Sequence, residues 1–290
     1  MSVLSELQRH ARRIPLMGLQ WPGGKRIAVV LSFDVDGEAG MLSLDANNRD
    51  RLGVLSAGAY GPNVGVPRIL TLLADLGVRA TFFVPGFTAD MHPELIPAIL
   101  RGGHEIGHHS YLHKRLDRCT AAEIDEELQR GLESLQRIGG VRPSGFRAPW
   151  WEFGCSVPDL LISNGFAYDS SLMDDDRPYL LTTQGGSLVE LPVSFLLDDW
   201  EQYGFVSTPA MGSVIEENDK VFRLWAEEFD ALCDEKASFI LTLHPWLSGR
   251  ASRVRLLARL IQYMQTTERV WFATCAELAA LCKASVESSR

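Results

Sequence analysis

The chain has 290 residues and a formal net charge of -9, and its basic residues are scattered rather than gathered into a stripe. This balance argues against nucleic acid or an anionic membrane as a partner. No apolar run is long enough to span a bilayer, and residues 1–20 lack the apolar segment of a secretory signal, so we expect a cytoplasmic protein. The five cysteines are odd in number and widely spaced, which is typical of neither a disulfide framework nor a zinc ribbon.

The first predicted element is a buried strand over residues 27–34, an apolar run that stops at Asp34 and Asp36. Residues 39–65 are rich in Gly and Asn and are predicted to form a long irregular loop, of the kind that is usually functional or bridges subunits. Residues 66–76 have the apolar spacing of a helix that ends at Gly77.

Strand and helix patterns then alternate to the end of the chain. Thr120 and Glu123 form a predicted capping box that opens one of the helices. The other helices are expected at 93–101, 157–163, 218–233, 254–264 and 276–282. Further strands are expected at 80–84, 104–106, 144–148, 166–168, 188–193, 238–243 and 270–273.

This alternation indicates an α/β fold with parallel strands joined by right-handed crossovers. Seven or eight such units close most naturally into a barrel, so we predict a single distorted (β/α)7–8 barrel domain over residues 1–290, with 39–65 as an insertion. An open doubly wound sheet is the structural alternative. No Gly-x-Gly-x-x-Gly follows a predicted strand to favour it.

A cluster of histidines marks the candidate site, because four of the seven lie between His104 and His113. His109 and His113 are four residues apart, so a helical turn would place both imidazoles on one face, where they could bind one metal ion. Two neutral imidazoles leave a divalent cation short of negative charge, and the predicted carboxylate donors are Asp34 and Asp36. Alternatively, the acidic pair is a solvated turn and the histidines belong to an ordinary surface.

The barrel hypothesis requires the active residues to lie at the C-terminal ends of strands. Each candidate for catalysis or metal binding follows a predicted strand in this way. These candidates are Asp34, Asp36, His109, His113, Arg147, Asp169 and His244.

Five segments resemble, in the same order, the motifs of the NodB-homology polysaccharide deacetylases, carbohydrate esterase family 4. They are Ser-Phe-Asp-Val-Asp-Gly at 32–37, His-Ser-Tyr-Leu-His at 109–113, Phe-Arg-Ala-Pro-Trp at 146–150, Tyr-Asp-Ser-Ser at 168–171 and Leu-Thr-Leu-His at 241–244. The similarity extends from about residue 27 to residue 244, and its specific parts are the His-Ser-x-x-His and Arg-x-Pro-aromatic motifs.

The resemblance implies one divalent metal ion, with zinc favoured, held by Asp36, His109 and His113. Asp34 would be the general base and His244 the general acid for the leaving nitrogen.

The remaining roles follow from the same resemblance. Arg147 would orient the base, Asp169 would bias the histidine or the arginine by its charge, and the backbone N–H of Trp150 would stabilise the oxyanion. Arg147 could instead be a structural ion-pair partner, Asp169 a turn residue, and the tryptophans simply core. His108 is expected to be structural or to support the ligands.

The acidic motif departs from the usual adjacent pair, Asp-Asp-Gly, because Val35 separates the two aspartates. Which carboxylate is base and which is ligand therefore stays open. This variant and the 39–65 insertion resemble the intracellular branch of the family, with cyclic imide hydrolases, allantoinase-like enzymes and peptidoglycan-deacetylase-like proteins.

The favoured substrate is a small cytosolic cyclic imide or ureide, bound in an enclosed pocket by Trp150, Trp151, Trp246 and Glu38. The alternatives are N-deacetylation of an amino sugar or peptidoglycan-type glycan, and a non-catalytic sugar-binding barrel. The branch resembled also suggests a homo-oligomer, a dimer or tetramer.

Overall fold

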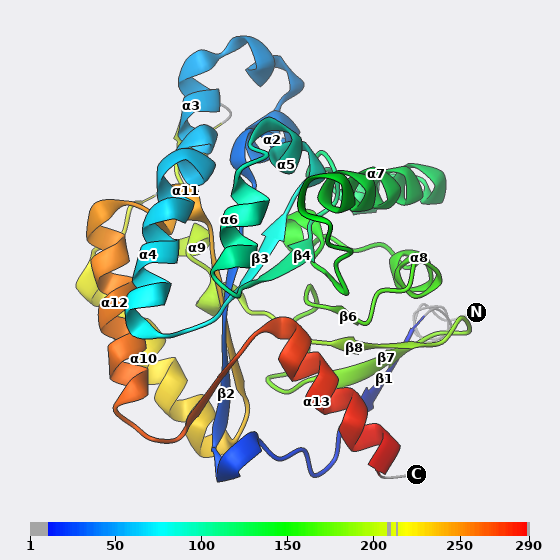
Figure 1. The fold of residues 1–290 in the computed structure, drawn as a ribbon, viewed down its shortest axis with the longest axis vertical. Helices are drawn as coiled ribbons and strands as arrows, with labels where there is room; N and C mark the ends of the chain where they lie inside the picture. Colours follow the sequence, from blue (N-terminus) through cyan, green and yellow to red (C-terminus); the bar gives the residue numbers. More distant parts are fainter. Residues whose placement is uncertain (1–10, 208–209, 213, 289–290) are drawn as a thin grey trace.

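The computed structural model describes residues 11–207, 210–212 and 214–288. Its centre is a curled sheet in which parallel pairs join β8, β6, β5, β4, β3, β2 and β11 in that order. Figure 1 shows β2, β3 and β4 near the middle of the molecule, and β6 and β8 beyond them. An isolated parallel bridge between Asp198 and Thr242 connects the chain after β8 to β11. The α/β class and the barrel architecture are therefore confirmed.

The strands of this sheet are β1 (Arg12–Pro15), β2 (Ile27–Asp34), β3 (Thr81–Val84), β4 (Glu105–His108), β5 (Gly145–Phe146), β6 (Tyr168–Asp169), β7 (Tyr179–Thr182), β8 (Ser187–Glu190), β11 (Ser238–Leu243) and β12 (Val270–Ala273). The last strand, β12, pairs with the first half of β2. Two elements that the sequence patterns did not predict, β1 and β7, extend the sheet in antiparallel fashion beyond β8. A separate two-stranded ribbon contains β9 (Val206–Ser207) and β10 (Ala210–Met211).

Helices surround the curled sheet, on its outside and at the C-terminal ends of its strands. They are α2 (Gly37–Leu44), α3 (Leu52–Tyr60), α4 (Val66–Leu76), α5 (Gly86–Met91), α6 (Leu95–Arg101), α7 (Ala121–Gly139), α8 (Val157–Ser163), α9 (Trp200–Tyr203), α10 (Asn218–Glu235), α11 (Pro245–Ser248), α12 (Ala251–Gln265) and α13 (Cys275–Ser288). The predicted capping box of α7 is present, and Gly77 ends α4 in a left-handed conformation. No helix in the described part of the chain is both long and apolar enough to cross a membrane.

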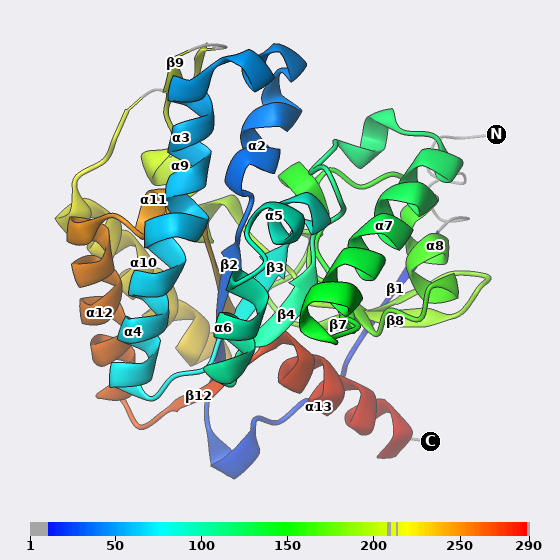
Figure 2. The same ribbon diagram turned by 45° about the horizontal axis from the view of Figure 1, so that its top comes forward.

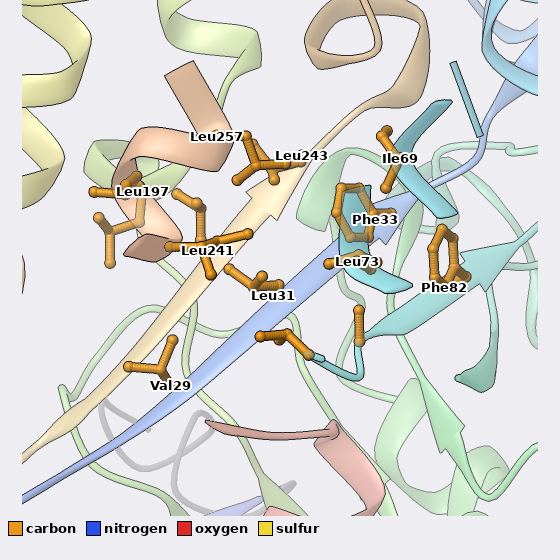
Figure 3. Packing of buried hydrophobic residues seen from close by; sticks show 14 of the residues in the cluster. Val29, Leu31, Phe33, Ile69, Leu73, Phe82, Leu197, Leu241, Leu243 and Leu257 are labelled. Atoms are coloured by element: carbon orange, nitrogen blue, oxygen red, sulfur yellow. The ribbon is translucent and has the colours of Figure 1, made fainter. Parts of the chain in front are cut away.

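The core explains why β2 is apolar along its whole length. Its odd-numbered side chains, Val29, Leu31 and Phe33, pack outward against α4 and α12, as Figure 3 shows. Ala28 and Val30 point the other way and join a second apolar cluster. Because both faces of the strand are buried, a continuous apolar run replaces the alternation of a half-exposed strand.

The prediction of an irregular loop over residues 39–65 was wrong. The segment is mostly helical, with α2, a 3-10 turn (Ala46–Asp50), α3 and a single π-helical turn (Gly61–Gly65) that leads into α4. A side chain at Gly58 would collide with the backbone of Gly37, and one at Gly65 with the backbone of Pro245. These glycines therefore allow close packing between elements, although they resemble loop residues in the sequence. Figure 2 shows α2 and α3 side by side beyond the C-terminal end of β2.

Candidate active site

The two predicted acidic residues lie at the end of β2, where the strand gives way to α2. Asp34 is the last residue of β2, and Asp36 immediately precedes α2. Both side chains are buried. The hydroxyl of Thr88 donates to the Asp36 carbonyl at 2.7 Å, which holds the backbone at this junction. The chain therefore delivers two carboxylates to one end of the barrel.

His109 and His113 face Asp36 across this end of the barrel, but a helical turn does not bring them there. The loop between them is irregular, and Ser110 and His113 have positive φ angles of 64° and 58°. The expected helical turn is therefore corrected to a loop with left-handed residues. Nε2 of His109 lies 3.5 Å, and Nε2 of His113 3.4 Å, from Oδ1 of Asp36.

Hydrogen bonds on the opposite ring nitrogens define the tautomer of each histidine. Nδ1 of His109 lies 2.7 Å from the carbonyl oxygen of Arg147, which can only accept, so Nδ1 carries the proton. Nδ1 of His113 lies 3.1 Å from the hydroxyl of Ser43, whose own proton goes to the Gly40 carbonyl. Both Nε2 atoms therefore present lone pairs toward Asp36.

This arrangement fits a divalent cation. Three acceptor atoms from Asp36, His109 and His113 converge, and buried Oδ1 of Asp36 has no hydrogen-bond partner among the described residues. Acceptors without a shared proton repel one another unless a cation lies between them. Ligands of a tetrahedral zinc ion lie roughly 3.4 Å apart, which is close to the two distances from Oδ1.

Arg147, at the end of β5, fixes Asp34. The guanidinium is fully buried and donates at 2.8 Å to Oδ1 of Asp34 and at 2.9 Å to the hydroxyl of Ser32. It also donates to the carbonyl and the hydroxyl of Ser170. Burial by itself lowers the pKa of Arg147, but the charge of Asp34 raises it, so the guanidinium stays charged. Oδ2 of Asp34 remains on the side of the metal ligands, 4.0 Å from Nε2 of His109.

His244 follows β11 and is held by Asp199, a residue that the sequence analysis missed. Nδ1 of His244 lies 2.7 Å from Oδ1 of Asp199, which also accepts from the His244 amide at 2.9 Å. Nε2 of His244 points back toward Oδ2 of Asp36 at 3.8 Å. Burial lowers the pKa of His244, but the charges of Asp198 and Asp199 raise it well above its usual value. The ring is therefore protonated on both nitrogens at neutral pH and carries a positive charge.

Asp169 interacts electrostatically with Arg147, one of its two predicted partners, and the described residues show no contact between Asp169 and His244. Its carboxyl accepts from the hydroxyl of Ser171 at 2.9 Å and faces Glu190 on the neighbouring strand β8. Asp199 contacts the histidine instead. Its sequence signal was the acidic pair Asp198-Asp199 after an apolar run, the same pattern that identified Asp34.

A pocket opens beside these groups, with an empty volume of about 720 Å³. Its acidic and histidine lining consists of Asp34, Asp36, His109, His113, Asp198, Glu201 and His244, and its apolar lining of Met41, Leu44, Trp150, Trp151, Phe195, Trp200 and Trp246 with Gly40. The three predicted tryptophans thus line the pocket. Glu38 does not, because its carboxylate bonds Nε2 of His92 at 2.9 Å, so its predicted contact with substrate is corrected.

The turn after Arg147 presents two of the tryptophans to the pocket. Trp150 and Trp151 have φ angles of 62° and 53°, a left-handed conformation that costs each of them about 1–2 kcal/mol. Within the turn, the amide of Trp151 donates to Ala148 and that of Glu152 to Pro149. These bonds do not use the Trp150 amide.

The chain is also similar to known proteins in sequence and in fold. A family model described as polysaccharide deacetylase matches residues 59–168. The peptidoglycan deacetylase of Helicobacter pylori is 30% identical, over 88% of this chain and 96% of its own. A putative polysaccharide deacetylase from Mycobacterium smegmatis has a solved structure with 45% identity and a TM-score of 0.91, covering 95% of this chain and 96% of that one.

An allantoinase of known structure is also similar, with 25% identity and a TM-score of 0.81, over 93% of this chain and 97% of that one. The nearly full-length similarity to the Helicobacter pylori protein decides the family. This chain belongs to the polysaccharide deacetylase family, whose members are hydrolases acting on carbon–nitrogen bonds other than peptide bonds.

Proposed function

We propose that this protein is a cytoplasmic, zinc-dependent hydrolase that opens a small cyclic imide or ureide. The observation that carries this proposal is the pocket, whose apolar lining consists mainly of aromatic rings packed against the acidic end of the barrel. Trp200 lies between Trp150 and Trp246, with ring centroids 6.2 and 5.8 Å away. Such flat, rigid surfaces suit a small planar ring better than an extended polymer, which needs an open groove.

The charges of the lining favour a neutral substrate. The charged side chains that line the pocket among the described residues are carboxylates and histidines, while Arg147 lies behind Asp34 and is fully buried. An uncharged imide or ureide is not repelled by these carboxylates, whereas an anionic substrate would face Asp198 and Glu201.

Asp36, His109 and His113 are the proposed zinc ligands. A zinc ion bound there would polarise the scissile carbonyl and acidify a water molecule. Asp34 is the proposed base, because Arg147 occupies its Oδ1 and leaves Oδ2 on the ligand side. The ligand role of Asp36 is supported by its Oδ1, which lies 3.5 and 3.4 Å from Nε2 of His109 and of His113.

His244 is the proposed acid for the leaving nitrogen. Amide nitrogen leaves poorly unless it is protonated, and the raised pKa of His244 keeps a proton on Nε2, which points toward the pocket. The Trp150 amide is proposed to stabilise the oxyanion, consistent with a turn whose own bonds do not use it. Arg147 and Asp199 orient the base and the acid.

A second candidate is N-deacetylation of an amino sugar or peptidoglycan-type glycan. The similarity to a protein named peptidoglycan deacetylase favours it, whereas the similarity to an allantoinase favours the cyclic substrate. A non-catalytic sugar-binding barrel is the third candidate. It is disfavoured because base, acid and ligand side chains are all retained.

The deciding experiment assays the purified protein with succinimide, allantoin and N-acetylglucosamine oligomers, with and without added zinc. We expect zinc-dependent opening of a cyclic substrate, and its loss in Asp34→Asn and His244→Ala. Turnover of the oligomers alone would support the second candidate, and normal turnover in both variants would refute the mechanism.

We also propose that the protein forms a homo-oligomer, a dimer or tetramer. Leu52 at the start of α3 and Phe205 beside β9 are exposed apolar residues, and burial in an interface would remove them from water. Light scattering that gives the mass of a monomer would contradict this proposal.

A further inference from the structure

We propose that Glu127 of α7 is a positioning residue for the metal centre, because its carboxylate holds the loop that carries His109 and His113. This inference rests on the metal site of the proposed function and adds to it a residue from a helix outside the pocket. Glu127 lies in the middle of α7, yet its side chain is only 1% exposed.

One oxygen of Glu127 collects three donors from consecutive residues of the loop. Oε2 accepts from the hydroxyl of Ser110 at 2.8 Å and from the amides of Tyr111 and Leu112 at 3.1 and 2.7 Å. Oε1 lies 2.9 Å from the ammonium of Lys114. The carboxylate thus binds residues on both sides of His113, and its contacts begin at the residue after His109.

The loop needs such an acceptor because of its backbone shape. Ser110 and His113 have left-handed φ angles, which residues with a β-carbon adopt only when the surroundings impose them. This shape separates the intervening amides from any strand or helix. Buried amides require partners, and the carboxylate of Glu127 supplies one acceptor for two of them.

The rest of the loop is fixed from other directions. Nδ1 of His108 accepts from the Ser110 amide at 3.1 Å. The amides of Gly86 and Phe87 at the start of α5 donate to the carbonyls of Ser110 and Tyr111, each at 3.0 Å. Glu127 therefore completes a set of contacts that holds the loop in the conformation in which Nε2 of His109 and Nε2 of His113 face Asp36.

Cobalt(II) binding to the metal-free full-length protein tests this role, because the visible spectrum reports ligand geometry as well as affinity. We compare wild type with Glu127→Gln and Glu127→Ala. An amide oxygen lacks the charge of the carboxylate and cannot serve all three donors as well, so we expect Glu127→Gln to bind cobalt about tenfold more weakly, with an altered spectrum. Glu127→Ala should lose more affinity, and Gln should rescue part of that loss.

Glu105→Gln is the matched control, since Glu105 is a partly buried carboxylate that also accepts several hydrogen bonds. It accepts from Thr81, Tyr168 and Ala276 at the other end of β4, away from the loop. We expect this variant to bind cobalt like wild type. If Glu127→Ala does not fold, cobalt binding by Glu127→Gln alone decides whether Glu127 positions the loop. Wild-type affinity and spectrum in folded Glu127→Gln would overturn the positioning role only, whereas absence of cobalt binding by wild type would overturn the metal centre as well.

Discussion

At the scale of single residues, the proposed acid His244 is held by the carboxylate of Asp199. Asp199 accepts from Nδ1 of the ring and also from the hydroxyl of Ser248, so it fixes both the tautomer and the orientation. We predict that Asp199→Asn lowers kcat about 100-fold, the size of a general acid's contribution. The double variant with His244→Ala should lose little more than His244→Ala alone, because the two residues act as a unit. Steady-state kinetics on the substrate identified by the screen measure this.

Asp198→Asn is the control for that prediction. Oδ1 of Asp198 lies 3.5 Å from Nδ1 of His244 and accepts from the Trp200 amide, so it contacts the ring less closely than Asp199 does. We expect Asp198→Asn to lower kcat by a smaller factor than Asp199→Asn does. Independent, additive losses for Asp199→Asn and His244→Ala would show that Asp199 acts in some other way.

At the scale of elements, β6 and β8 lie side by side and bring Asp169 opposite Glu190. Burial raises the pKa of Asp169 to about 6, and burial together with the charge of Asp169 raises the pKa of Glu190 well above its usual value. The folded protein thus keeps protons that the unfolded chain releases above about pH 4. Binding of these protons stabilises the folded protein at lower pH. The stabilisation is lost as the pH rises through the folded-state pKa values of the two carboxyl groups.

We predict that Glu190→Gln becomes more stable relative to wild type as the pH rises from 4 to 7, by at most about 1.4 kcal/mol per pH unit. The carboxamide can still accept from the amides of Ser171 and Leu172, which Glu190 binds at 3.0 and 2.9 Å, and it can donate to Asp169. Urea unfolding at several pH values measures the difference. A constant difference across this range would mean that the carboxyl pair does not hold protons in the fold.

At the scale of the whole molecule, the proposed metal ligands join distant parts of the chain, because Asp36 follows β2 and the histidines follow β4. A cation that binds only the folded chain stabilises it by about 2.7 kcal/mol at 100 times its Kd. We predict that zinc at this excess raises the Tm of the metal-free protein by roughly 5 °C. Calorimetry with and without zinc measures the shift. His113→Ala should show little shift, and an equal shift in this variant would place the bound zinc at another site.

Much of the fold was predictable because its signals lie within a few neighbouring residues. The apolar run of β2, the capping box at Thr120 and the glycine after α4 each predicted an element that the structure contains. The ligands Asp36, His109 and His113 could also be proposed, since strand ends of a parallel barrel meet on one face. The sequence by itself thus determined the alternation of the parallel strands with helices and the chemistry available at the strand ends.

The tertiary structure decided the features that depend on partners far along the chain. Gly65 lies in a helical turn where the backbone of Pro245 leaves no room for a β-carbon, and no local pattern around Gly65 records that contact. In the same way, closing the barrel brings Asp199 to His244 and leaves Asp169 with Glu190. Which carboxylate contacts which partner is set by packing between distant elements, so only the folded chain could assign these roles.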